Sequence, residues 1–191
     1  LFRSITTIFY LVNRQNSNNM IQKIILMNNR AYIHLALCIA VLVQIRLIPH
    51  PPNFTPILAA SIFSGFYFRH FFSGLFIIIL SMFLGDLYLG FHSTMFFTYI
   101  SLAVAVILGL YIKHFKFTEI LVTGLTSSIC FFLITNFGAW LTLEMYEKNL
   151  AGLFQSYVMA IPFFHNTLIS TLLYLAILKL LFNFSIKKKV A

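Results

Sequence analysis

The sequence predicts an all-α, polytopic membrane protein built as a six-helix transmembrane bundle. Composition is the first reason: 60% of the 191 residues are hydrophobic and 9% charged, against about 45–50% and about 25% in soluble domains. Mean hydropathy, at +0.92, is the second. The third is patterning, because long apolar runs alternate with short polar breaks that hold most of the Lys and Arg residues. The chain is short enough to be a single membrane domain without a soluble catalytic part.

Six apolar segments are expected to cross the bilayer, where a helix needs about 20 residues. They are Ala31–Ile48, Pro56–Phe68, Phe71–Gly90, Met95–Ile112, Glu119 to about Leu143, and Pro162–Phe182. The second is short for an upright crossing. Gly152–Ala160 and the last span are together too long for one crossing. The sequence therefore predicts a short outer or re-entrant helix over Gly152–Ala160, with Pro162 as the first residue of the last span.

The basic residues predict the orientation. If both termini are cytoplasmic, all thirteen Lys and Arg residues except Arg46 and Lys148 fall on the cytoplasmic side, as the positive-inside rule expects. Residues 1–29 are then a cytoplasmic lead-in, 30–184 the membrane domain and 185–191 a basic cytoplasmic tail. The formal net charge of +9 orients the chain in the lipid bilayer on this interpretation, and no nucleic-acid partner is expected.

A polar, proline-rich stretch, Arg46–Pro56, separates the first two spans. Its prolines, at positions 49, 51, 52 and 56, fix φ and disfavour helix at the residues before them. The stretch is therefore expected to form a stiff cap that holds Arg46, His50 and Asn53 at the mouth of the bundle.

Further polar residues are expected at the same, outer end as this cap. The candidate site consists of Arg46, Asn53, Asp86, His92, Asn136, Trp140, Glu144, His165 and Asn166. Ionisable groups at this depth are costly unless they face a wet cavity or one another, so their concentration predicts a substrate site.

Roles follow from side-chain chemistry. Arg46 would neutralise an anionic group of the solute, and Asn53 and Asn136 would orient it through hydrogen bonds. Trp140 would stack on a ring. Three further side chains would line or gate the mouth: Asp86, His92 and His165. His165 and Asn166, in the first turn of the last span, would offer free backbone N–H groups to an anion.

Simpler interpretations exist for several of these residues. Arg46 and Asp86 could pair with each other and hold two helices together. Trp140 could belong to the aromatic belt at the membrane interface. Asn136 could make a hydrogen bond between helices.

Other chemistries find less support. His50, His92 and His165 with Asp86 and Glu144 could bind a transition metal, but no pair has helical ligand spacing, so no metal and no cofactor is predicted. Motifs such as HExxH and GxSxG do not occur in the sequence, so no enzyme is predicted. A nucleotide-binding motif does not occur either, so the energy for transport would come from partner subunits or a gradient.

Small residues form ridges at helical spacing in two spans. They are Ala36 and Ala40 in the first span, and Ser101, Ala105 and Gly109 in the fourth. Such ridges let helices approach closely, so they would serve packing inside the chain or dock a partner subunit.

Four motifs carry a resemblance to a known family. They are Arg46-Leu-Ile-Pro-His-Pro-Pro-Asn-Phe-Thr-Pro56, Ile134-Thr-Asn-Phe-Gly-Ala-Trp140, Tyr146 with Ala151-Gly-Leu153, and Ala160-Ile-Pro-Phe-Phe-His-Asn-Thr167. The chain resembles an uncharacterised bacterial family of six-span proteins described as transport proteins (DUF6580-like), which is similar to the substrate-binding S components of energy-coupling factor (ECF) vitamin transporters. The resemblance implies an S-component-like bundle in the bacterial plasma membrane and energising subunits that dock on small-residue ridges.

The sequence thus predicts a transport component that captures a small organic solute, vitamin-like or a precursor, in a pocket open to the outer face. One alternative is a gradient-driven secondary transporter, for which Asp86 is the strongest titratable candidate. Another is a structural or assembly subunit with no substrate of its own.

Overall fold

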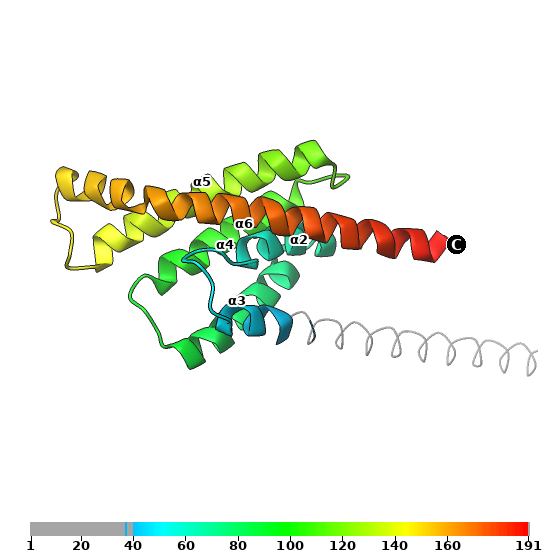
Figure 1. The fold of residues 1–191 in the computed structure, drawn as a ribbon, viewed down its shortest axis with the longest axis horizontal. Coiled ribbons are helices and arrows are strands. Elements are labelled where there is room, and N and C mark those ends of the chain that lie inside the picture. The colour runs from blue at the N-terminus through cyan, green and yellow to red at the C-terminus, as the bar shows by residue number, and fades with distance from the viewer. Residues whose placement is uncertain (1–36, 38–39, 191) are drawn as a thin grey trace, which may run out of the picture. The chain divides into compact units, whose positions relative to one another are not determined.

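The structure is a computed structural model that describes residue 37 and residues 40–190, of which 40–190 belong to one compact unit. The described residues are all-helical (Figure 1). A helical stretch over residues 40–47 is followed by α2 (Ile57–Phe68), α3 (Phe71–Leu89), α4 (Met95–Leu110), α5 (Phe117–Thr142) and α6 (Leu150–Val190). The predicted all-α class is confirmed.

Helices α2 to α5 begin and end within two residues of the predicted segments. Local chemistry explains the ends. Helix α2 stops at Arg69, which adopts a left-handed φ of 55° and donates its backbone N–H to the Gly65 carbonyl. Helix α3 stops at Gly90, whose φ of 96° suits a residue without a Cβ. Of the first predicted span, Ala31–Ile48, residues 37 and 40–47 are helical, and residues 31–36, 38 and 39 lie outside the described residues.

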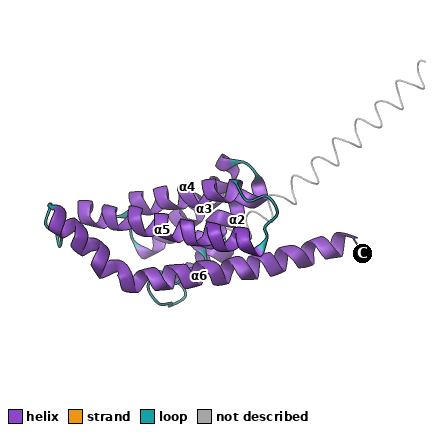
Figure 2. Cartoon of the chain, turned by 90° about the horizontal axis from the view of Figure 1, so that it is seen from above, coloured by secondary structure: helices purple, strands orange, loops and turns teal. Residues whose placement is uncertain are grey.

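The prediction for the last segment is wrong. Gly152–Ala160 and the residues after it form one continuous helix, α6, with Pro162 in its interior. The side-chain oxygen of Asn149 begins this helix by accepting the N–H of Gly152 at 2.8 Å. Proline removes one backbone hydrogen bond and bends a helix without having to end it, and Figure 2 shows α6 changing direction in its N-terminal part. Helix α6 also continues through most of the predicted basic tail, as far as Val190.

Helix α2 lies at the centre and contacts α3, α4, α5 and α6. It approaches α4 closely because glycines face the partner backbone on both helices. A Cβ added to Gly65 would lie 2.1 Å from the Val106 carbonyl oxygen, and one added to Gly109 would lie 2.0 Å from that of Ile62. The α4 ridge predicted from small residues is therefore used for packing inside the chain.

Three helical segments of the described residues are long and apolar enough to cross a membrane: Phe71–Leu89, Phe117–Thr142 and Leu150–Asn183. Helices α2 and α4 are apolar but shorter. At a rise of about 1.5 Å per residue, α2 is about 18 Å long, less than a hydrocarbon core of about 30 Å. The structure thus supports three of the six predicted spans by length and composition.

Candidate functional site

A cavity of about 440 Å³ lies at the end of the bundle where α3 and α5 end and α2 and α4 begin. The stretch over 40–47, the proline-rich cap and helices α2 to α6 all contribute to its lining. Residues singled out from the sequence line it together: Arg46, His50, Asn53, His92 and Asn136. The structure therefore brings segments that are far apart in the sequence around one hollow.

The cap is attached to α6 by hydrogen bonds from two side chains. Asn166 donates from Nδ2 to the Pro52 carbonyl at 2.9 Å, and Ser170 donates from its hydroxyl to the Asn53 carbonyl at 3.4 Å. Asn53 has a φ of 61°, which Asn tolerates better than most residues. This backbone turn places Asn53 at the wall of the cavity.

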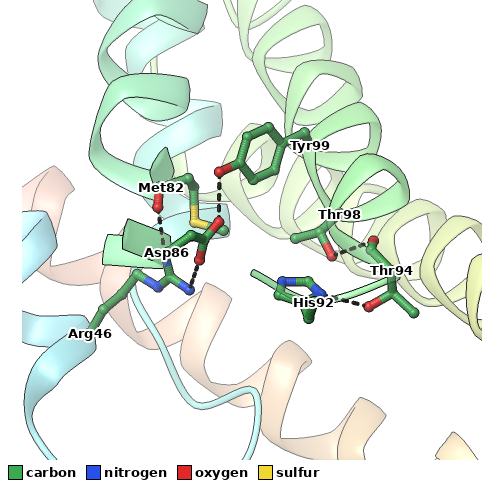
Figure 3. Close-up of polar contacts among 7 residues, drawn as sticks. All are labelled: Arg46, Met82, Asp86, His92, Thr94, Thr98 and Tyr99. Carbon is green, nitrogen blue, oxygen red and sulfur yellow. Dashed lines mark hydrogen bonds and ion pairs between the residues drawn. The ribbon is translucent and has the colours of Figure 1, made fainter. Parts of the chain in front are cut away.

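Arg46, Asp86 and Tyr99 form a polar triad beside the cavity (Figure 3). Arg46 Nη2 lies 2.7 Å from Asp86 Oδ1, and Arg46 Nη1 donates to the Met82 carbonyl at 3.0 Å. The Tyr99 hydroxyl donates to the other carboxylate oxygen at 2.6 Å. Asp86 is 1% exposed and Arg46 15%, so only the arginine reaches the lining. Arg46 and Asp86 therefore form an ion pair with each other, which is one of the simpler interpretations of these residues given above.

Gly85 makes room for this triad. A Cβ at position 85 would lie 2.7 Å from Arg46 Nη1. The guanidinium therefore lies directly on the α3 backbone, where Gly85 leaves the Met82 carbonyl accessible to it.

Two further predicted site residues, His92 and Asn136, form hydrogen bonds with groups close to them in the sequence. His92 Nδ1 lies 2.9 Å from the Thr94 hydroxyl, a contact drawn in Figure 3. Asn136 donates from Nδ2 to the Phe132 carbonyl of its own helix at 2.7 Å. That bond fixes the amide while the residue lines the cavity.

The other predicted site residues are not part of the lining. Trp140 donates from its indole N–H to the Glu147 carbonyl at 2.9 Å, and Lys148 donates to the Trp140 carbonyl. Glu144 is exposed. Asp86 does not border the cavity, but it forms the ion pair that positions Arg46, which does.

His165 and Asn166 are also placed differently from the prediction. Because α6 begins at Leu150, both residues lie within the helix and not in a first turn, so their backbone N–H groups are not the free ones that favour an anion. His165 is exposed, and its ring nitrogen Nδ1 lies 3.1 Å from the Ile161 carbonyl. Asn166 holds the cap.

The sequence prediction missed the hydroxyl groups of the lining. These are Thr55, Thr94, Thr98, Thr135, Thr167, Ser170 and Thr171. A signal was present in α6, where Thr167 and Thr171 are four residues apart and thus share a helix face. Single hydroxyls in apolar helices are common and rarely stand out, because they bond to the preceding turn.

Metal binding finds no site in the part of the chain that the structure describes. No group of three or more His, Cys, Asp or Glu side chains is placed there to hold an ion. His50 and His92 line the cavity, whereas His165 does not.

Comparison with known proteins gives one match. A family model described as a family of unknown function (DUF6580) matches residues 27–191. No curated protein and no solved structure matches the chain.

Proposed function

The chain belongs to the DUF6580 family, and we propose that it is an integral membrane protein that captures a small organic solute from outside the cell. The solute binds in the cavity between the proline-rich cap and helices α2 to α6. The proposed location is the bacterial plasma membrane, with several crossings and both termini in the cytoplasm. This orientation follows from the distribution of Lys and Arg and puts the cavity on the outer side.

The cavity is the observation that carries the proposal. Its volume of about 440 Å³ lies within the range of about 300–1,000 Å³ that is typical of small-molecule sites. Arg46, Asn53 and Asn136 reach it from three separate elements. A polar hollow between apolar helices is costly to maintain unless it serves to bind something.

Passage inward needs energy, which energising partner subunits would supply in the proposed mechanism. The resemblance to S components of ECF transporters supports such an arrangement. Because α2 occupies the α4 ridge, those subunits would dock on other surfaces of the chain. A gradient-driven transporter would differ in a measurable way: the purified single chain in liposomes would take up solute when a proton gradient is applied.

Mass spectrometry of small molecules that co-purify with the full chain tests the proposal. The wild type is expected to retain a solute that the Asn136→Ala variant loses, because Asn136 lines the cavity. Gln155→Ala, a change of an exposed amide on α6, is the matched control and should retain it. A chain that carries no solute in any form, or an Asn136→Ala variant that retains it fully, would favour a structural or assembly subunit.

A further inference from the structure

The balance of charge in the cavity restricts the solute that the proposed function would capture. Among the described residues that line it, Arg46 is the only one with a permanent charge. That charge is already met by Asp86, 2.7 Å away. An anionic ligand would therefore approach a guanidinium that a buried carboxylate neutralises, and it would be repelled by that carboxylate.

Exchange of partners does not remove this difficulty. If a ligand carboxylate or phosphate took Arg46 away from Asp86, the carboxylate of Asp86 would keep, among the described residues, only the bond from Tyr99 while remaining 1% exposed. A buried charge without its partner is strongly unfavourable.

The hydroxyls of the lining offer acceptors to a ligand. Thr135, Thr167 and Thr171 each donate their hydroxyl hydrogen to the carbonyl four residues earlier, at 2.7, 3.1 and 2.6 Å. A hydroxyl has one hydrogen and two lone pairs, so these groups can still accept but have no second hydrogen to donate. Carboxylates and phosphates only accept when fully ionised, whereas O–H and N–H groups match such a lining.

A smaller, aromatic-walled lobe adjoins the main cavity. Its volume is about 50 Å³, several times the roughly 10–15 Å³ that a single buried water needs. Its apolar walls come from α5 and α6, and four polar side chains complete the lining: Asn53, Thr135, Asn136 and Thr167. The polar side chains of the lobe are shared with the main cavity, whereas the residues that border the lobe alone are apolar: Phe132, Ala160, Phe163 and Phe164.

We infer that the cavity binds an uncharged solute that bears several O–H or N–H donors and places a small apolar group in this lobe. Arg46 then acts as a positioned donor to one acceptor of the solute and not as a counter-ion. The inference rests on the proposed function and adds the substrate class.

Isothermal titration calorimetry tests whether the cavity prefers an uncharged solute. It measures the binding of a matched series of probes to the full chain in lipid nanodiscs. The series is thymidine, its 5′-monophosphate and 5′-amino-5′-deoxythymidine, with panthenol and pantothenate as a second pair. The neutral members are expected to bind at least tenfold more tightly than their charged analogues. Preferred binding of a charged member, lost in Asn136→Ala, would overturn the substrate class but leave the proposed function standing. Absence of binding by every member would overturn the substrate class, whereas the proposed function would fail only if no solute co-purifies with the full chain.

The role of the lobe is tested by removing the methyl group of the ligand and by filling the lobe with a larger side chain. Loss of the thymine methyl in 2′-deoxyuridine is expected to weaken binding about fourfold, the equivalent of about 0.8 kcal/mol per buried carbon. Ala160→Leu should abolish this difference, whereas Ala151→Leu, at an exposed position of the same helix, should preserve it. Equal affinity for thymidine and 2′-deoxyuridine in the wild type, or a difference that survives Ala160→Leu, would overturn the role of the lobe. A thermal unfolding midpoint measured for each variant separates loss of binding from loss of fold.

Discussion

The two ends of the helical bundle use polar residues in opposite ways. At the packed end, where α2 and α4 end and α5 begins, charged side chains bond to the backbone. Arg69 donates to the Lys113 carbonyl at 3.0 Å, and Lys179 donates to the Phe115 carbonyl at 2.5 Å. Glu119 accepts three backbone N–H groups of the loop before α5. These charges close the loops and border neither the main cavity nor its smaller lobe.

Aromatic packing seals the same end. Phe115 is 1% exposed, and its ring stacks on that of Phe66 with centroids 4.6 Å apart. Phe63 and Phe182 pack around this pair. The backbone of Phe115 adopts a φ of 52°, a strained conformation for a bulky residue that surrounding contacts must hold in place.

At the cavity end, side chains bond mainly to other side chains or to their own helix. Arg46, which Asp86 holds in place, and the hydroxyls of α5 and α6 border open space instead of closing it. The comparison shows that polarity in an apolar helix does not by itself indicate a site. What distinguishes the cavity end is that, besides groups that hold a loop such as Asn166 and Ser170, it has polar groups that face a hollow.

Removal of the aromatic plug should have the largest effect. Phe115→Ala is expected to lower the free energy of unfolding by about 3–5 kcal/mol, the usual cost of deleting a buried phenyl ring. Unfolding in detergent micelles, followed by intrinsic fluorescence against denaturant, measures it. Phe117→Ala, where the side chain is 61% exposed, is the matched control. Similar losses for the two variants would contradict the contrast between the ends.

Disruption of the triad at the cavity end is expected to have the second largest effect on stability. Asp86→Asn leaves Arg46 without its counter-ion, so a loss of about 3 kcal/mol in the free energy of unfolding is expected. The combined Arg46→Met, Asp86→Leu and Tyr99→Phe variant should recover most of it, because no polar group is then left unpaired. The same unfolding assay measures the free energy of unfolding of both variants. A stable Asp86→Asn variant would show that the pair contributes little to the fold.

A methyl group at Gly85 should act through Arg46. The added Cβ of Gly85→Ala would meet Arg46 Nη1 at 2.7 Å, so overpacking of about 1–3 kcal/mol is partly offset by a gain of roughly 1 kcal/mol in helix propensity. A net loss of about 1 kcal/mol is expected. In an Arg46→Met background the loss should shrink or become a gain, as a double-mutant cycle would reveal. An unchanged loss in that background would separate Gly85 from the triad.

The sequence predicted the helices better than it predicted the site. Apolar runs bounded by Arg69, Gly90 and Lys116 define α2 to α5 closely, because these breaks act locally. Pro162 misled the prediction for α6, since a proline can either begin a helix or bend one, and only packing against α5 decides which.

The lining was harder to predict because it depends on the rotation of each helix about its axis. Asn136 and Trp140 are four residues apart, yet the lining continues from Asn136 through Ala139 and Leu143. Residues four apart share a helix face, but this spacing alone does not identify which neighbours of Asn136 line the cavity. Tyr99 was missed for a related reason: its contact with Asp86 requires the register of α3 against α4, which no local pattern encodes.

The smallest effects are expected at the predicted site residues that lie outside the cavity. Glu144→Gln and His165→Ala change exposed side chains, so each should alter the free energy of unfolding by less than about 0.5 kcal/mol. Neither should change the amount of solute that co-purifies, in contrast to Asn136→Ala. Quantitative mass spectrometry of the three variants, each normalised to the protein recovered, makes the comparison. Loss of solute in Glu144→Gln or His165→Ala would extend the binding surface beyond the cavity, and would weaken the distinction between residues that line a hollow and residues that merely lie at the same end.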